Sequence, residues 1–269
     1  MPFAHVNGID INYLLEGDGP ETVVLINGLA DDLLTWFYQV DALIAAGYRV
    51  LRFDNRGIGE SSKPAGPYTT ALFAQDAKAL VDELKISNFH LMGVSMGGMI
   101  AQEYALAYQS DLKSLTLACT YASPGPFCSR MFSLWQDIAS VHGVPTVMRD
   151  VTLWAFTQEF FLRREEELKE FEVAMAYMNQ SVPAYLAQLH SIQTHDTRSR
   201  MKQVKVPTLV LAGEEDILIP VSLSKELSEL TPGSLFKTTP GGHGCMWEHP
   251  EPFNQQFISF INTSKGGEK

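Results

Sequence analysis

The stretch of sequence that decides the fold reads Phe89-His90-Leu91-Met92-Gly93-Val94-Ser95-Met96-Gly97-Gly98-Met99-Ile100-Ala101-Gln102-Glu103-Tyr104. It begins as an apolar run, breaks at small residues and continues with helical spacing, which predicts a strand that turns sharply into a helix. Residues 93–97 fit the G-x-S-x-G pattern of a nucleophile elbow, with Ser95 at the apex of the turn. Glycine is expected on both sides because a Cβ there would crowd the neighbouring strand or helix. The helix from Met96 directs N–H groups and partial positive charge toward an oxyanion formed on the substrate of Ser95.

The composition is that of a globular protein large enough for one α/β domain. The chain has 269 residues, of which 45% are hydrophobic and 19% charged. Its 31 acidic and 20 basic residues give a formal net charge of −11, which argues against nucleic acid or an anionic membrane as partner. Cys119, Cys128 and Cys245 show no CxxC spacing, and no apolar leader follows Met1, so we expect a reduced, cytoplasmic protein.

Around the elbow, predicted strands alternate with predicted helices. This alternation is typical of a mostly parallel sheet that is covered by helices on both faces. Asn7-Gly8 predicts an antiparallel hairpin at the sheet edge. The other predicted strands cover residues 23–26, 48–53, 115–118, 206–212 and 235–238, and the helices between them cover 36–46, 68–84, 221–230 and 252–261. The polar tail 263–269 is expected to fray.

Between residues 124 and 203 the sequence predicts helices only, at 127–141, 145–161, 163–178 and 183–191. We therefore expect a core formed by residues 1–123 and 204–269, with residues 124–203 as a helical lid near the carboxyl ends of the strands, where ligands bind. Large apolar residues are frequent there, and some should line a pocket facing the elbow: Met131, Phe132, Trp135, Trp154, Phe156, Phe160, Phe161, Met175, Tyr177 and Met178. An inward arginine, among Arg130, Arg163 and Arg164, would instead allow pairing with a substrate carboxylate.

A serine hydroxyl needs a base to act as a nucleophile at neutral pH, and that base needs a third group to fix its tautomer. Asp216 follows the strand that ends at residue 212, and His243 lies in a glycine-rich loop after the strand that ends near residue 238. Both residues should therefore meet Ser95 at the same edge of the sheet. Glu215 is the nearest alternative to Asp216 as the acid, and Glu214 is a weaker one.

The backbone N–H groups of Met96 and Leu29 are the candidate donors to the tetrahedral intermediate. Met96 directly follows Ser95, and Leu29 lies in the loop after strand 23–26, where Gly28 allows close approach of a substrate. The sequence has no phosphate-binding P-loop, no dinucleotide-binding glycine pattern and no metal-binding His or Cys spacing, so we expect neither cofactor nor metal.

Over essentially its whole length the chain resembles the α/β-hydrolase superfamily. The matching segments are Asn27-Gly28-Leu29, Phe53-Asp54-Asn55-Arg56-Gly57-Ile58-Gly59-Glu60-Ser61, Gly93-Val94-Ser95-Met96-Gly97-Gly98, Leu211-Ala212-Gly213-Glu214-Glu215-Asp216 and Gly242-His243. The resemblance implies an α/β-hydrolase fold, with a mostly parallel eight-stranded sheet, flanking helices and a helical lid insertion. It also implies Ser95, Asp216 and His243 as catalytic triad, with Leu29 and Met96 as oxyanion donors. Many members have histidine where this chain has Asn27, so the hydrogen bonding behind that loop should differ.

Within the superfamily the chain is most similar to small ester and lactone hydrolases such as the 3-oxoadipate enol-lactonases. The leading hypothesis is therefore a serine hydrolase that cleaves a small-molecule carboxylic ester or lactone through an acyl-serine intermediate. The alternatives are a C–C bond hydrolase of β-diketones or ring-fission products, a cofactor-free haloperoxidase-type activity, and a hydrolase-fold receptor for a small molecule. The sequence indicates neither the natural substrate nor the oligomeric state.

Overall fold

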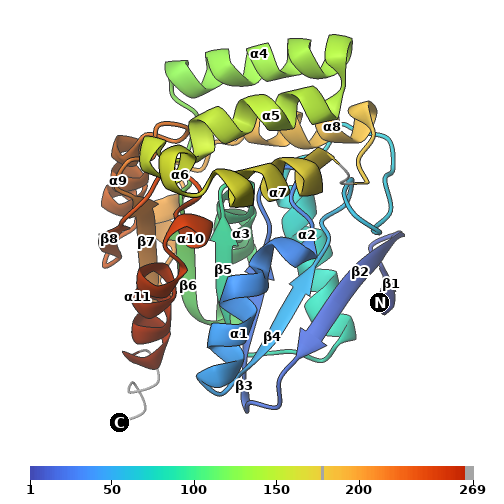
Figure 1. Cartoon of the computed structure of the whole chain (residues 1–269). Helices are drawn as coiled ribbons and strands as arrows, with labels where there is room; N and C mark the ends of the chain where they lie inside the picture. The colour runs from blue at the N-terminus through green and yellow to red at the C-terminus, as the bar shows by residue number, and fades with distance from the viewer. Residues whose placement is uncertain (177–178, 264–269) are drawn as a thin grey trace.

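The computed structural model describes residues 1–176 and 179–263, and in this part of the chain eight strands form one sheet (Figure 1). Their order across the sheet is β1-β2-β4-β3-β5-β6-β7-β8. The strands are β1 (Phe3–Val6), β2 (Ile9–Glu16), β3 (Glu21–Ile26), β4 (Tyr48–Phe53), β5 (Phe89–Val94), β6 (Leu112–Ala118), β7 (Thr208–Gly213) and β8 (Leu235–Thr239). From β4 to β8 all neighbours are parallel.

The antiparallel edge forms as the sequence predicts. β1 pairs with β2 and β2 with β4 in antiparallel register. Asn7 and Gly8 join β1 to β2 with φ angles of 48° and 75°, the left-handed values that a tight hairpin turn requires. The parallel strands could not be joined by such a turn, so each needs a helical crossover.

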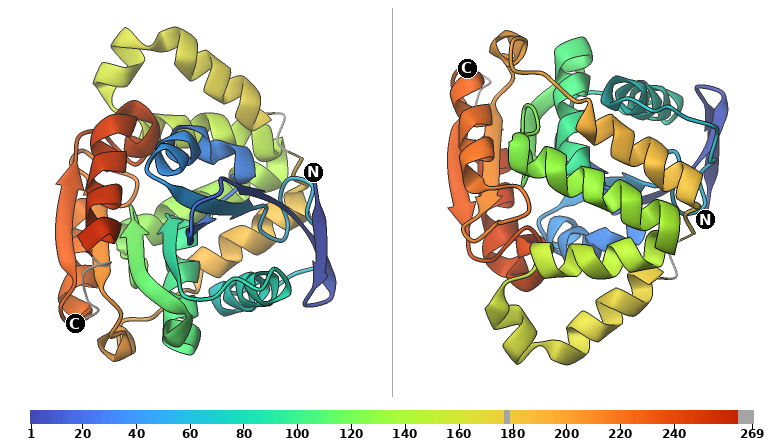
Figure 2. Two further views of the ribbon diagram at one scale, coloured as in Figure 1. Left: turned by 90° about the horizontal axis from the view of Figure 1, so that it is seen from below. Right: turned by 90° about the horizontal axis from the view of Figure 1, so that it is seen from above.

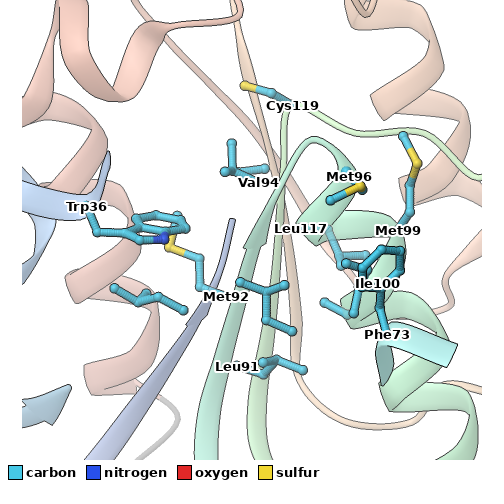
Figure 3. Packing of buried hydrophobic residues seen from close by; sticks show 14 of the residues in the cluster. Trp36, Phe73, Leu91, Met92, Val94, Met96, Met99, Ile100, Leu117 and Cys119 are labelled. Atoms are coloured by element: carbon cyan, nitrogen blue, oxygen red, sulfur yellow. The ribbon is translucent and has the colours of Figure 1, made fainter. Parts of the chain in front are cut away.

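Helices cover both faces of the sheet. Figure 2 shows α1 (Phe37–Ala45) and α11 (Pro250–Thr263) on one face, with α2 (Thr70–Glu83), α3 (Met96–Tyr108) and α9 (Val221–Leu230) on the other. All six residues of the central strand β5 are buried as a result. In Figure 3, Met92 of β5 lies toward Trp36 on one side, while Phe73 and Ile100 pack on the other. The short elements are the 3₁₀ turns η1 (Leu33–Trp36), η2 (Gln109–Asp111) and η3 (Met201–Gln203), and helix α10 (Cys245–Glu248), which was not predicted.

A helical insertion separates β6 from β7. It consists of α4 (Pro126–His142), α5 (Val144–Ala155), α6 (Gln158–Arg163), α7 (Glu165–Ala176) and α8 (Val182–Gln193). These helices lie over the carboxyl ends of the parallel strands (Figure 1). Within the described residues of 124–203 no strand occurs, as predicted. Tyr177, Met178 and the tail 264–269, for which expectations were stated above, lie outside the described residues.

One predicted helix is wrong. The sequence pattern indicates a single helix over 145–161, but the chain leaves helical geometry at Phe156, where φ is −108° and ψ is 151°. The buried Glu248 carboxylate causes the break, because it accepts hydrogen bonds from the N–H (3.1 Å) and the hydroxyl (2.6 Å) of Thr157. Thr157 in turn caps α6 by accepting from the N–H of Phe160. Among the described residues, no helix combines the length and apolar character that a membrane span requires.

Candidate active site

Ser95 occupies a strained turn between β5 and α3. Its φ of 54° and ψ of −119° lie outside the regions that a non-glycine residue normally adopts. Hydrogen bonds hold the backbone there, including a longer one from the N–H of Met99 to the Ser95 carbonyl (3.3 Å). The Ser95 N–H donates to the carbonyl of Ala118 (2.9 Å), and the Ser95 carbonyl accepts from the N–H of Gly98 (2.9 Å) and the hydroxyl of Thr120 (2.8 Å). These contacts fix the backbone position of Ser95.

The glycines of the elbow are needed for close packing. A Cβ on Gly93 would lie 2.1 Å from the carbonyl oxygen of Gly97, and one on Gly97 would lie 2.0 Å from that of Ile26. These contacts are with rigid backbone and cannot be relieved by a side-chain rotation. Both φ angles are ordinary, so the requirement for glycine here is steric: the first turn of α3 passes directly over β3 and β5.

The structure brings Asp216 and His243 together from the loops after β7 and β8. The His243 Nδ1–H donates to Asp216 Oδ2 at 2.8 Å. The second carboxylate oxygen of Asp216 accepts from the N–H of Ile219 at 2.8 Å, so the carboxylate cannot rotate freely. Asp216 is buried, whereas Glu214 and Glu215 are exposed. The acid that contacts the imidazole is therefore Asp216, as the sequence favoured, and neither of its two neighbours.

Ser95 and His243 line one cavity beneath the helical insertion. Leu29, the candidate oxyanion donor, also faces it. The helices α4, α5 and α8 supply six of its other lining residues, all apolar: Phe132, Trp135, Met148, Val151, Ala155 and Ile192. Phe132 and Trp135 thus lie where the sequence predicted, whereas Phe160 and Phe161 do not line this cavity.

The three arginines that could have served a substrate carboxylate do not line this cavity. Arg130 donates to the carbonyl of Pro126, and Arg163 pairs with Glu159 on the surface. Arg164 pairs with Glu167. Among the residues that the structure describes, neither arginine nor lysine lines the cavity.

The loop after β3, which carries Leu29, is held by side chains on both sides. Asn27 donates from Nδ2 to the carbonyl of Phe53 (2.9 Å) and accepts from the indole N–H of Trp36. Gln188 of α8 accepts from the N–H of Ala30 (3.2 Å), which ties the loop to the insertion. Asn27, the residue that departs from the family pattern, thus anchors this loop.

Met96, the other candidate oxyanion donor, is the first residue of α3. Its N–H therefore has no acceptor within the helix.

Acidic neighbours control the charge of His243. Burial, the strongest single influence, lowers its pKa, but the charge and hydrogen bond of Asp216 raise it. Cys119 and Asp31 add to the rise, and the resulting pKa is about 9. Such an environment stabilises the imidazolium that a general base becomes when it takes a proton.

Two residues near the site were missed by the sequence analysis. Asp31, four residues after Asn27, lines the cavity with its side chain buried. Cys119, directly after β6, has its sulfur within 4.8 Å of ligand atoms of both Asp216 and His243, and 3.5 Å from the sulfur of Cys245. The only sequence signal was position: both follow a strand that ends at the same edge as the elbow.

The fold agrees with the comparisons to known proteins. The model of the alpha/beta hydrolase fold family matches residues 21–250, and the chain belongs to that family.

Among its relatives is a protein of Azorhizobium caulinodans named "Putative carbamate hydrolase RutD", which is 28% identical over 261 residues covering 97% of this chain and 98% of that protein. The enol-lactonase from Burkholderia xenovorans LB400 has a similar structure, with a TM-score of 0.90 and 28% identity over 97% of this chain and 100% of that one. A bromoperoxidase from Bacillus anthracis is also similar, with a TM-score of 0.86 and 26% identity over 94% and 96% of the two chains. Hydrolase activity is thus supported by family and relatives alike.

Proposed function

We propose that this protein is a serine hydrolase that cleaves a small, uncharged carboxylic ester or lactone through an acyl-Ser95 intermediate. The observation that carries the proposal is the hydrogen bond from His243 to the buried carboxylate of Asp216, in a cavity that Ser95 also lines. In the neutral form of the ring, whose population grows as the pH approaches the His243 pKa of about 9, a carboxylate that accepts from Nδ1–H leaves Nε2 free to accept the serine proton.

In the proposed mechanism, His243 Nε2 removes the hydroxyl proton of Ser95 while Oγ attacks the carbonyl carbon of the substrate. The negative charge that develops on the carbonyl oxygen is bound by the N–H groups of Met96 and Leu29. The imidazolium of His243 then gives its proton to the leaving oxygen, and the alcohol departs. For a lactone the leaving oxygen stays tethered to the acyl group. A water molecule, activated by the same imidazole, attacks the acyl-serine and releases the acid.

The lining of the cavity supports a neutral substrate. Aliphatic and aromatic side chains of the insertion surround the site, and transfer of each substrate methylene from water to such a surface contributes about 0.8 kcal/mol. We propose that the insertion acts as a lid whose inner face selects the substrate. The enol-lactonase among the similar structures is consistent with a lactone. The described lining of the cavity contains neither arginine nor lysine, which argues against a negatively charged lactone.

A carbamate is the second candidate substrate class. The observation in its favour is the name of the curated relative, which assigns it to carbamate hydrolysis. The same residues could act on a carbamate, because its carbonyl also forms a tetrahedral intermediate. The amide resonance of a carbamate makes its carbonyl carbon less electrophilic than that of an ester. Comparison of kcat/KM for ethyl butanoate and ethyl carbamate shows which of the two substrate classes the protein prefers.

Active-site labelling tests the proposal directly. A fluorophosphonate should inactivate the protein and modify one serine, which peptide mass spectrometry should identify as Ser95. The matched control is Ser129→Ala, at an exposed position of α4, which should label like the wild type. Chelators should not change the rate of ester hydrolysis. Labelling of another serine, or loss of activity to EDTA with recovery on addition of zinc, would contradict the mechanism.

A further inference from the structure

A carboxyl group lies beside the proposed nucleophile, on the loop that carries Leu29. The side chain of Asp31 is buried and lines the cavity with Ser95 and His243. A Cβ built on Gly28 would lie 2.6 Å from Asp31 Oδ2 and 3.6 Å from the Cβ of Ser95. The carboxyl of Asp31 therefore occupies the space over Gly28 on the side that faces Ser95.

Among the described residues, Asp31 differs from the other buried aspartates because its carboxyl accepts no hydrogen bond from a side chain. The carboxylate of Asp76 is paired with Arg56, and that of Asp54 accepts from the side-chain amide of Asn12 (2.7 Å). Within the described residues, the Asp31 carboxyl receives a hydrogen bond from the backbone of Gly28 and from no side chain. Its capacity to accept or donate is thus left for a molecule in the cavity.

We propose that Asp31 is a specificity-determining residue, which excludes substrates that carry a negative charge on the acyl group. This inference deepens the proposed function and rests on it, because it assumes that the acyl group is bound next to Ser95. The reason is electrostatic. A substrate carboxylate in this cavity would meet the Asp31 carboxylate in a weakly polar environment. Among the described lining residues, His243 is the one that can carry a positive charge, and that charge is already paired with Asp216.

The exclusion should depend on pH. Burial and the neighbouring charge of Asp32 raise the pKa of Asp31 to about 7, although His243 and the Gly28 N–H oppose the shift. Asp31 is therefore mostly neutral at pH 6 and mostly ionised at pH 8. The charged or titratable groups that face His243 are Asp216, Cys119 and Asp31 itself.

Two methyl esters of nearly equal shape provide the test. Monomethyl succinate carries a carboxylate at the position where methyl 4-methylpentanoate carries an isopropyl group. For the wild type at pH 8, kcat/KM should favour the neutral ester, and Asp31→Asn should reduce that preference by on the order of tenfold. The neutral-to-anionic ratio of the wild type should also rise several-fold from pH 6 to pH 8, whereas that of Asp31→Asn should not.

Asp32→Asn is the matched control. It removes one negative charge from the same loop, and asparagine preserves the cap that Asp32 provides to the N–H of Leu34. The side chain of Asp32 does not line the cavity, so the neutral-to-anionic ratio of Asp32→Asn should differ from that of the wild type by less than about twofold. The inference is overturned if the neutral-to-anionic ratio of kcat/KM is the same in Asp31→Asn as in the wild type. It is also overturned if Asp32→Asn changes this ratio as much as Asp31→Asn does.

The wild-type pH comparison needs no variant, so it decides the question even if Asp31→Asn does not fold: a flat ratio between pH 6 and pH 8 overturns the inference. Failure of the proposed function is recognised separately, because the wild type would then hydrolyse neither ester. In that case the same comparison is made on binding, by calorimetry with 4-methylpentanamide and succinamate. Tighter binding of succinamate at pH 8 would overturn the role of Asp31.

Discussion

At the scale of single residues, the proposed mechanism assigns distinct roles to Ser95 and His243. Substitution of either residue should nevertheless cause a similar loss of activity. Ser95→Ala and His243→Ala should each lower kcat by about 10⁴-fold or more, because the members of a triad act as a unit. Steady-state kinetics on a neutral ester measures this, with circular dichroism to show that the fold is retained. Turnover near the wild-type level in Ser95→Ala would assign the nucleophile to another residue.

Asp216 and Glu215 offer a comparison between adjacent carboxylates. Asp216→Asn should lower kcat on the order of 10⁴-fold, as in the serine proteases, because an amide can donate to Nδ1 and thus favour the wrong tautomer. Glu215→Gln should have little effect, since Glu215 is exposed and His243 bonds to Asp216. The reverse ranking of the two variants would move the acid to Glu215.

Sequence could predict the residues whose position follows from a strand end. Ser95, Asp216 and His243 each follow a strand of the parallel part of the sheet, and parallel strands deliver such residues to one edge. Asp31 could not be selected in this way, because its burial depends on how the loop after β3 folds back over Gly28. Cys119 likewise required knowledge of which loops meet across the sheet.

At the scale of elements, the elbow depends on backbone contact between α3 and the strands. Gly97→Ala should destabilise the protein by about 3 kcal/mol or more, since its Cβ would lie 2.0 Å from the carbonyl oxygen of Ile26 and only a backbone shift could relieve it. Gly125→Ala is the control, because a Cβ there meets nothing nearer than Leu223 at 3.7 Å. Urea unfolding of the two variants measures the difference. Equal stabilities would show that the turn adapts at small cost.

Sequence patterns predicted these elements well where the local signal and the tertiary contacts agree. The strand 48–53 and the helix 221–230 are found with the predicted bounds. The predicted helix over 145–161 is wrong because its break depends on Glu248, which is distant in sequence and holds Thr157 by a buried hydrogen bond. The periodicity of the local sequence carries no information about a contact with a residue so distant in the chain.

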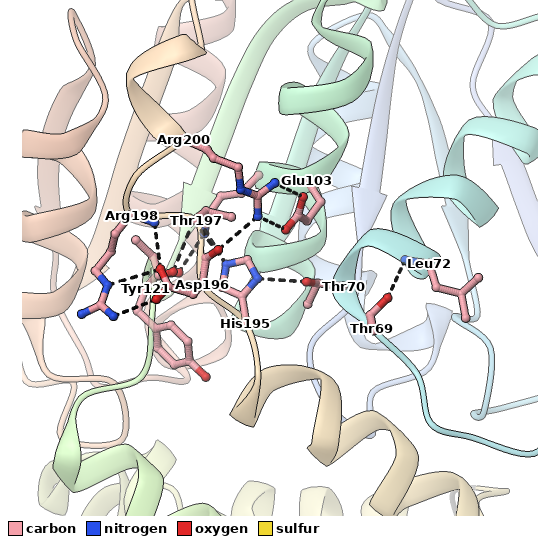
Figure 4. A network of polar contacts seen from close by, with 12 residues as sticks. Thr69, Thr70, Leu72, Glu103, Tyr121, His195, Asp196, Thr197, Arg198 and Arg200 are labelled. Atoms are coloured by element: carbon pink, nitrogen blue, oxygen red, sulfur yellow. Dashed lines mark hydrogen bonds and ion pairs between the residues drawn. The ribbon is translucent and has the colours of Figure 1, made fainter.

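At the scale of the whole molecule, the helical insertion must be joined to the core at its carboxyl-terminal end, after α8. Figure 4 shows the junction, where His195, just after α8, lies between residues from α2 and α3. The hydroxyl of Thr70 donates to His195 Nδ1 (2.9 Å), and the His195 Nε2–H donates to Gln102 Oε1 (3.3 Å). Both bonds suit a neutral imidazole, because protonation of Nδ1 would remove the acceptor that Thr70 uses.

This junction should make stability fall in mild acid. Burial, with a smaller contribution from Arg200, lowers the pKa of His195 to about 3, whereas the unfolded chain has an ordinary histidine pKa near 6.5. The unfolded state therefore binds one more proton below pH 6.5, so the stabilisation is complete above that pH and is lost as the pH falls toward 3. The contribution is roughly 1 kcal/mol of unfolding free energy for each pH unit.

Urea unfolding at pH 7.5 and pH 5.5 measures this effect. The free energy of unfolding should decrease less between these pH values in His195→Gln than in the wild type. His190→Gln, at an exposed position of α8, should keep the wild-type decrease. An unchanged pH dependence in His195→Gln would mean that the junction takes up a proton without cost.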